Sequence, residues 1–160
     1  MSSYQSVTLM TEMKKMITAD IHEVTRLWYE TSIIAHDFIP ESYWNKNREL
    51  MKTIYLPASE TVIVRDKTNI LGFISTKDHY LAALFIEPEH QGKGLGRKLL
   101  KHIQRNSSFL ELKVFAKNLS AVKFYQKNGF KIVDEKIGKD TGEREFIMEW
   151  NKKKLFTTNR

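Results

Sequence analysis

Residues 85–100 read FIEPEHQGKGLGRKLL. An apolar run stops at Pro88, glycines follow at the alternate positions 92, 94 and 96, and leucines then recur at helical spacing. Glycine lets the backbone approach a ligand closely, and the start of a helix offers unpaired N–H groups with a partial positive charge. The segment is therefore predicted to form a strand, a loop and a helix that together bind an anion, typically a phosphate. A plain glycine turn is the structural alternative.

The spacing of these glycines differs from that of two common phosphate loops. A Walker loop requires G-x-x-x-x-G-K-[ST], a string that the chain lacks. A dinucleotide-binding loop requires G-x-G-x-x-G after the first strand of a βαβ unit, whereas the spacing here is G-x-G-x-G after a strand in the middle of the chain. Both nucleotide-binding readings therefore fail. The cationic residues in and after the loop are Lys93, Arg97, Lys98 and Lys101.

Hydrophobic periodicity and turn residues place further elements on both sides of this segment. Helices are predicted over residues 20–35, 41–54, 94–104 and 118–129, with Asp20 and Asn118 as N-caps of two of them. Gly129 suits a left-handed position, after which Phe130 is expected to fold back onto Tyr125. Strands are predicted near residues 13–17, 61–65, 70–76, 80–86, 110–115, 131–137 and 145–150. The run at 80–86, YLAALFI, is expected to be buried on both faces, and the element order predicts a mixed α/β fold around one sheet.

Composition excludes several classes of protein. The 160 residues fit one domain, with residues 1–11 as an N-terminal extension and residues 151–160 as a basic tail. The absence of cysteine excludes disulfides, Cys-ligated metals and a cysteine nucleophile, and the spacing of the five histidines predicts no metal site. No apolar run approaches the roughly 18 residues of a membrane span, and the first residues do not resemble a signal peptide. We therefore expect a cytoplasmic protein without a membrane partner.

The positive charge is concentrated in one part of the chain. Residues 91–131 hold ten Lys or Arg against one acidic residue, Glu111, a local balance of +9 in a chain whose total is +7. Such a segment favours an anionic partner, which can be nucleic acid, a membrane surface or a phosphorylated small molecule. Solvated surface lysines are the simpler explanation.

Two motifs in this region resemble those of a known family. Gln91–Gly96 (QGKGLG) fits the Q/R-x-x-G-x-G/A loop of the GNAT N-acetyltransferases, and Asn118–Phe130 (NLSAVKFYQKNGF) resembles their second block, N-x-x-A-x-x-[FL]-Y-x-x-x-G-F. The front segment, with AHDFI at residues 35–39 and Trp44, is similar to the YiaC/YjaB-type bacterial subgroup. The resemblance implies a single α/β domain over residues 1–160. Its twisted sheet would be mixed but mostly antiparallel, with six to seven strands flanked by four helices.

The resemblance also implies a cofactor and a set of site residues. The co-substrate would be acetyl-CoA, whose pyrophosphate binds the loop amides. The preceding strand would splay from its neighbour, so that its backbone pairs with the pantetheine arm, which Asn118 also binds. The N–H of Phe85 would stabilise the oxyanion, and Tyr125 would protonate the departing thiolate. A phenol suits that role because its pKa of about 10 is close to that of a thiol, although a packing tyrosine is the alternative. The full expected set is Leu84, Phe85, Ile86, Gln91, Gly92, Lys93, Gly94, Leu95, Gly96, Arg97, Asn118, Ala121, Phe124 and Tyr125.

The acceptor and the general base are less constrained. Some family members carry a carboxylate where this chain has Tyr80, so a carboxylate base at that position is absent. His36 is a candidate base, an acceptor contact or a polar loop residue, and a base acting through water is equally allowed. The acceptor is expected to be a primary amine: a protein lysine, a protein N-terminus or a small molecule. The candidate acceptor-site wall, whose residues suit a core equally well, is Trp28, His36, Phe38, Tyr43, Trp44 and Tyr80.

Three functions remain in competition at this point. The first is an acetyl-CoA-dependent N-acetyltransferase that attacks the thioester directly, acts without a metal and exists as a monomer or homodimer. The second is a non-catalytic CoA-binding or sensor domain on the same fold. The third is a basic nucleic-acid-binding module, which the chain supports by charge but by no recognisable motif, so that no nucleic acid partner is expected.

Overall fold

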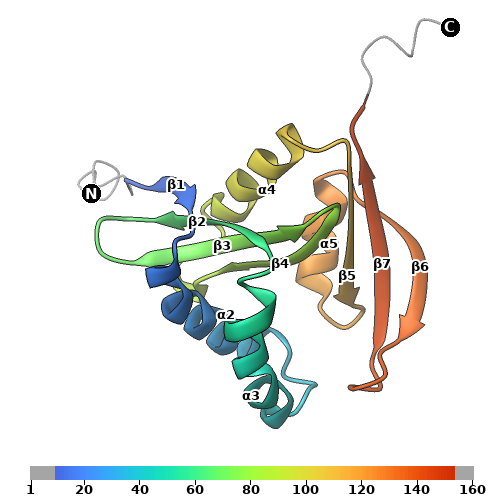
Figure 1. Cartoon of the computed structure of the whole chain (residues 1–160). Coiled ribbons are helices and arrows are strands. Elements are labelled where there is room, and N and C mark those ends of the chain that lie inside the picture. The colour runs from blue at the N-terminus through green and yellow to red at the C-terminus, as the bar shows by residue number, and fades with distance from the viewer. Residues whose placement is uncertain (1–9, 154–160) are drawn as a thin grey trace, which may run out of the picture.

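A seven-stranded sheet runs through the centre of the computed structural model, which describes residues 10–153 (Figure 1). The strand order is β1-β2-β3-β4-β5-β7-β6, and every neighbouring pair is antiparallel except β4 with β5. The strands are β1 (Glu12–Lys15), β2 (Glu60–Arg65), β3 (Ile70–Lys77), β4 (Tyr80–Ile86), β5 (Phe109–Phe115), β6 (Lys131–Ile137) and β7 (Arg144–Asn151). The mixed, mostly antiparallel sheet predicted from the sequence is confirmed.

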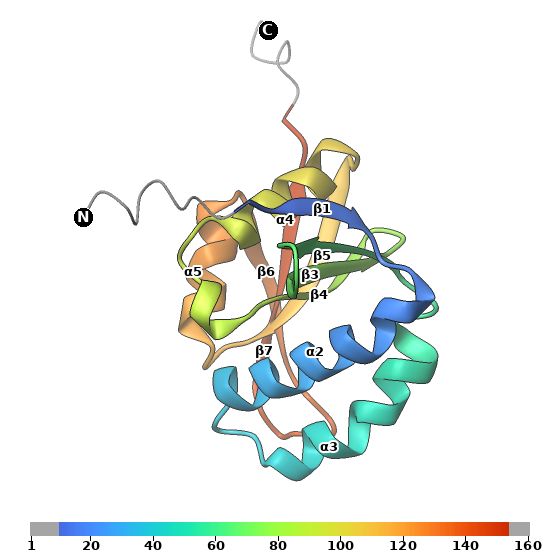
Figure 2. The same ribbon diagram turned by 90° about the vertical axis from the view of Figure 1, so that its left-hand side faces the viewer.

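Four α-helices cover the two faces of the sheet (Figure 2). One core cluster joins the first two helices to β2, β3 and β4, and the other joins the last two helices to β3, β4, β5 and β7. The helices are α2 (Ile21–Ala35), α3 (Glu41–Leu50), α4 (Leu95–Arg105) and α5 (Leu119–Lys127). Short turns of other helix types are η1 (Thr18–Asp20), η2 (Met51–Tyr55) and η3 (Pro88–His90).

Most predicted boundaries lie within a few residues of the observed ones. The helix predicted over residues 41–54 is α3 followed by the π-helical turn η2. The first strand covers residues 12–15, earlier than the predicted 13–17. The carboxylate of Asp20 accepts from the N–H of Ile17 at 3.0 Å and makes no capping bond to α2, so the predicted cap is wrong in its contact. Residues 1–9 and 154–160, most of the predicted extension and tail, lie outside the described residues.

The end of α5 agrees with the predicted cap in atomic detail. Gly129 has φ +95°, the left-handed conformation that other residues rarely adopt. The N–H of Phe130 then donates to the carbonyl of Tyr125 at 3.0 Å, and the two rings lie 5.4 Å apart between centroids. This contact fixes the helix that carries Tyr125 against the strand that follows it.

Strand β4 separates from β5 after a single paired position. Tyr80 pairs with Glu111, and the described strands share no further register from there (Figure 1). As a result Ala82 is exposed, and Leu84 and Phe85 are only partly buried. The expectation that residues 80–86 are buried on both faces is therefore wrong, because the divergence of two neighbouring strands opens one edge of β4.

Candidate active site

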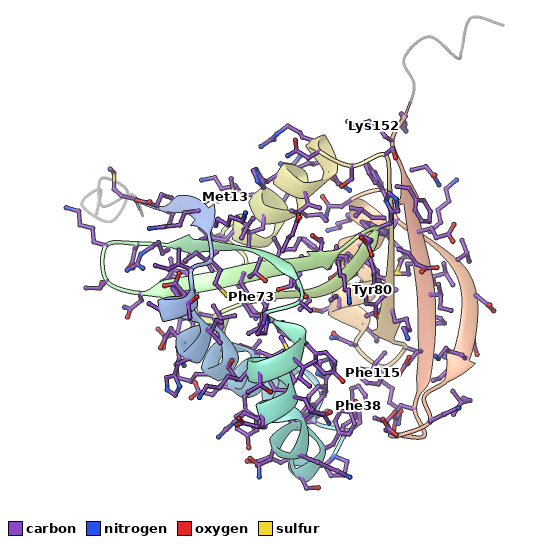
Figure 3. All side chains as sticks on the ribbon, viewed as in Figure 1. Met13, Phe38, Phe73, Tyr80, Phe115 and Lys152 are labelled. Atoms are coloured by element: carbon purple, nitrogen blue, oxygen red, sulfur yellow. The ribbon has the colours of Figure 1, made fainter. Side chains whose placement is uncertain are left out.

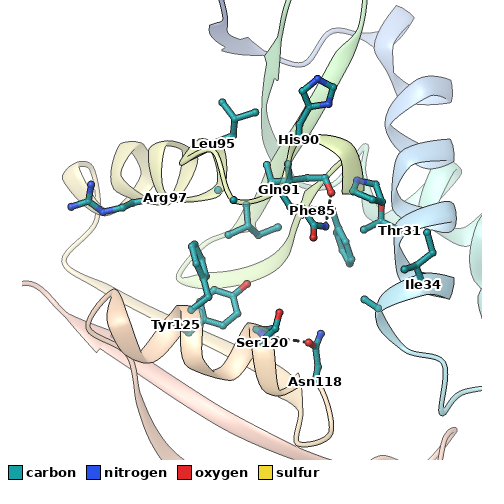
Figure 4. A pocket seen from close by; sticks show the side chains of 18 of the residues that line it. Thr31, Ile34, Phe85, His90, Gln91, Leu95, Arg97, Asn118, Ser120 and Tyr125 are labelled. Carbon is teal, nitrogen blue, oxygen red and sulfur yellow. Dashed lines mark hydrogen bonds between the residues drawn. The ribbon is translucent and has the colours of Figure 1, made fainter. Parts of the chain in front are cut away.

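A cavity of about 790 Å³ occupies the opening beside β4 (Figure 4). Its walls come from the end of β4, the glycine loop, the first turns of α4 and α5, and the last turns of α2. Every expected cofactor-binding residue except Lys93 lines it, and Lys93 is exposed on the loop outside the lining. The chain thus brings two motifs that lie far apart in the sequence to the same cavity.

The glycine loop has the backbone of an anion site. Gly92 and Gly94 have φ +78° and +86°, and a Cβ at either position would meet no protein atom within 4 Å. Both glycines are therefore required for their backbone conformation rather than for lack of space. The first N–H groups of any helix have no intrahelical acceptor. Gly94 is the N-cap of α4 and has no side chain to accept from them, so they remain available to a ligand. The side-chain amide of Gln91 donates to the carbonyl of Ile86 at 3.0 Å and ties the loop to the end of β4.

Tyr125 lies at the inner end of this cavity on α5. Its side chain is 8% exposed, and its ring packs between those of Phe124 and Phe130. Burial, with a smaller effect of Tyr80, raises the pKa of the Tyr125 phenol well above its usual range. Because its pKa is raised, the phenol is protonated at neutral pH. The hydroxyl makes no hydrogen bond to any described residue, so it is available to a ligand in the cavity.

The hydrogen-bond register of β4 corrects one expectation about the oxyanion donor. The N–H of Glu87 donates to the carbonyl of Leu71 on β3, so the alternation of an antiparallel pair directs the N–H of Phe85 toward Phe73 as well. The N–H groups of Leu84 and Ile86 then face the open edge of the strand. The expected role of the Phe85 N–H is therefore wrong, because β3 already uses that group.

Helix α2 supplies a wall of the cavity that the sequence did not predict. Thr31, Ile34 and Ala35 line it together, since positions i, i+3 and i+4 share one helix face. The Thr31 hydroxyl is buried without a hydrogen-bond partner, and so is Nδ1 of His90, another lining residue. Helical spacing from Thr31 is the signal that could have found this wall. The other unpredicted lining residues are Pro88, His90, Lys117, Leu119 and Ser120.

Five of the six predicted acceptor-site residues, all except Tyr80, form an aromatic cluster outside the lining of this cavity. The His36 ring stacks on Trp44 at 5.0 Å and contacts Phe38 and Phe115 at 5.8 and 5.2 Å. Phe38 and Phe115 lie side by side between α3 and the β5–β7 part of the sheet (Figure 3). Phe115 was not predicted as part of this cluster. The buried members are Trp28, His36 and Trp44, and the partly exposed ones are Phe38, Tyr43 and Phe115.

Burial changes the protonation behaviour of His36 and Tyr80, two residues of the predicted acceptor-site wall. His36 lies in the turn after α2 and is 6% exposed, so it is a buried polar residue of this loop. Burial lowers the pKa of the His36 imidazole, and a hydrogen bond to the Ser32 carbonyl opposes that effect. Burial raises the pKa of the Tyr80 phenol, and Glu145 and Glu111 raise it further. Glu87 pairs with Arg26 of α2 at 3.1 Å, a contact that holds α2 against the end of β4.

Within residues 10–153, no group of three or more His, Asp or Glu side chains is arranged to hold a metal ion. None of the helices in that range has both the length and the apolar character needed to span a membrane.

Comparisons with known proteins identify the family of the chain. Residues 33–152 match the family described as acetyltransferase (GNAT) domain. The peptidyl-lysine N-acetyltransferase YiaC of Escherichia coli is 32% identical over 133 residues, which cover 82% of this chain and 91% of that protein. The peptidyl-lysine N-acetyltransferase YjaB of Salmonella typhimurium is 31% identical over 117 residues, which cover 73% and 81%.

Solved structures agree with this assignment at the level of the fold. The solution structure of apo YjaB from Escherichia coli superposes with a TM-score of 0.78 at 24% identity, covering 88% of this chain and 97% of that one. The PaiA N-acetyltransferase of Thermoplasma acidophilum, crystallised in complex with coenzyme A, gives a TM-score of 0.76 at 22% identity over 89% and 99%. With the matching family profile, the sequence relatives and the cavity at the diverging strands, the chain belongs to the GNAT family and is an acetyl-CoA-dependent N-acetyltransferase.

Proposed function

We propose that this N-acetyltransferase acts on the side-chain amine of lysine residues in proteins. The observation that supports a catalytic role is the free hydroxyl of Tyr125. It is buried at the inner end of the cavity, and the glycine loop lies at the other end. A non-catalytic binding domain would not need an unpaired phenol at that place. The peptidyl-lysine relatives, which align with most of the chain, favour protein lysine over other amines.

The polar groups in the cavity walls match those of acetyl-CoA. The N–H groups of the loop and of the first turn of α4 suit the pyrophosphate, and Arg97 adds charge beside them. The free backbone edge of β4 at Leu84 and Ile86 suits the amides of the pantetheine arm. The unpartnered hydroxyl of Thr31 and the unpartnered Nδ1 of His90 offer further polar contacts.

Acetyl transfer replaces the C–S bond of the thioester with a C–N bond. The acceptor ammonium first loses one proton through water, since Tyr80 replaces the carboxylate base of other family members. As the neutral amine nitrogen bonds to the thioester carbonyl carbon, the N–H of Leu84, the free β4 donor farther from the loop, is placed to stabilise the negative oxygen. The C–S bond then breaks, and Tyr125 gives its proton to the departing thiolate. The new amide nitrogen releases its extra proton through water, and a proton from solvent restores the Tyr125 phenol.

A transfer assay tests this proposal. The enzyme is incubated with acetyl-CoA and one of three acceptors: a lysine peptide with a blocked N-terminus, a peptide with a free N-terminus and no lysine, or spermidine. We expect CoA release and peptide acetylation with the lysine peptide, and loss of both in Tyr125→Phe. Acetylation of spermidine alone would contradict the protein acceptor, and tight acetyl-CoA binding without transfer to any amine would support the sensor interpretation.

A further inference from the structure

We propose that His36 is a positioning residue that locks the side chain of Asn118 and thereby fixes the inner end of the cofactor cavity. The inference rests on the proposed function, because it assigns a role within the same site. It replaces the earlier candidate roles of His36 as a base or an acceptor contact. The two residues are far apart in the sequence, and they join the end of α2 to the beginning of α5.

A directed chain of hydrogen bonds connects the two helices. Nδ1 of His36 lies 3.0 Å from the carbonyl of Ser32, Nε2 lies 3.2 Å from Nδ2 of Asn118, and Oδ1 of Asn118 accepts from the N–H of Ala121 at 3.3 Å. A carbonyl can only accept, so Nδ1 must carry the proton and Nε2 of the neutral ring must accept. Asn118 must then present its NH₂ group to His36. The helix N–H requires the same orientation, because it donates to the oxygen of that amide.

This chain leaves Asn118 little freedom for its own ligand. Its oxygen caps α5 and one of its two N–H hydrogens is used by His36, so one N–H and the second lone pair of the oxygen remain for a ligand. Asn118 and Ala121 line one wall of the cavity, and Ala35, which precedes His36, lines the facing wall. The His36–Asn118 bond therefore bridges the two walls and sets the direction of the remaining N–H.

The surroundings of His36 keep it a neutral acceptor. The ring is enclosed by Trp44, Phe38 and Phe115, and burial lowers its pKa. Among the charged groups nearest in the chain, Asp37 is exposed and Lys117 pairs with Glu143 at 3.3 Å. A protonated imidazole would oppose two donors across the 3.2 Å contact, so the bridge requires the neutral ring.

Kinetics of four variants separate the bridge from packing. His36→Phe keeps an aromatic ring against Trp44 but removes the acceptor, and Asn118→Ser keeps a cap for α5 but removes the amide donor. We expect His36→Phe to raise KM for acetyl-CoA about 3- to 10-fold, the range expected for one hydrogen bond, and Asn118→Ser to raise it at least as much. The double variant should be no worse than Asn118→Ser alone, and His36→Gln, which retains an acceptor, should recover part of the loss of His36→Phe. Additive effects in the double variant would overturn the proposal.

An NMR titration gives a second readout that needs no acceptor amine. Wild-type His36 should show the tautomer protonated at Nδ1. Asn118→Asp keeps the cap but replaces the donor with a carboxylate, so the midpoint of the His36 titration should rise by about one pH unit or more. A wild-type ring protonated at Nε2, or a midpoint that ignores the change at residue 118, would contradict the bridge. Failure of the lysine assay would leave this result unaffected.

Discussion

The hydroxyl of Tyr125 is buried and has no hydrogen-bond partner among residues 10–153. Because we propose it as the acid that protonates the departing thiolate, its removal should affect catalysis more than folding. Tyr125→Phe is expected to lower kcat about 100-fold, a typical contribution of a general acid. The Kd for CoA should change little, because the ring and its contacts with Phe124 and Phe130 remain. Steady-state kinetics and calorimetric titration with CoA measure the two quantities. Equal kcat values for the variant and the wild type would remove the general-acid role.

Burial of the Tyr125 phenol also predicts a pH profile. Its raised pKa keeps the acid form populated beyond the usual value of about 10. Ionisation of Tyr125 should therefore cause no fall in wild-type kcat below about pH 10. A loss of kcat at lower pH that disappears in a Tyr125→Phe variant with residual activity would show that the phenol ionises earlier than its burial implies.

Burial of His36 predicts that the stability of the protein decreases as the pH falls. In the unfolded chain its pKa is near 6.5, and burial lowers it in the folded protein. His36 is neutral in the folded and the unfolded chain at high pH. Below about pH 6.5 the unfolded chain binds a proton first, so the free energy of unfolding decreases until the pH falls below the pKa of His36 in the folded protein. His36→Gln should reduce the difference between the unfolding free energies at pH 8 and pH 5, measured with urea. His22→Gln, on the exposed side of α2, serves as the control and should retain the wild-type difference.

The glycine loop provides the sharpest test of one element. Gly94 and Gly142 share a positive φ, +86° and +72°, and a Cβ on either would meet no atom within 4 Å. Valine at either position should therefore cost a similar amount of stability, about 1–3 kcal/mol from backbone strain. Only Gly94→Val should abolish CoA binding, because Gly142 lies in the β6–β7 turn outside the cavity. Retained CoA affinity in a folded Gly94→Val protein would contradict the loop assignment.

The elements that the sequence predicts well are those whose residues carry a local pattern. The leucines of α4, the Asn118 cap and the Gly129–Phe130 turn specify their own geometry, and each appears as expected. The opening of β4 could not be predicted from YLAALFI itself, because an apolar run does not reveal which neighbour is missing. It was implied by the resemblance to the GNAT family, and the single paired position between β4 and β5 agrees with it. The Thr31 wall and the His36 bridge were missed for a related reason. Both depend on contacts between elements that are distant in the sequence.

Over the whole molecule the cationic side chains exceed what the cofactor cavity uses. A second hollow of about 470 Å³ lies at the far ends of α4, α5 and β7. Its cationic lining residues are Lys101, Arg105, Lys127, Lys152 and Lys153. Lysine and arginine in the last turns of helices are favoured by the helix dipole, and Lys152 donates to the carbonyl of Arg105 at 3.0 Å. These charges therefore have a structural reason, and they add to the positive field around a protein whose cofactor cavity lies at the other ends of α4 and α5.

That field predicts how salt acts on the reaction. Acetyl-CoA carries several phosphate charges, and a positive surface raises its rate of encounter with the protein. Raising NaCl from about 0.05 M to about 0.5 M shortens the screening length to a few ångströms, so KM for acetyl-CoA should rise several-fold while kcat changes little. The double variant Lys101→Gln/Lys127→Gln removes charge outside the cavity and should show a higher KM at low salt with a weaker salt dependence. If this variant matches the wild type at every salt concentration, the distant lysines contribute no steering, and the attraction comes from the loop and Arg97 alone.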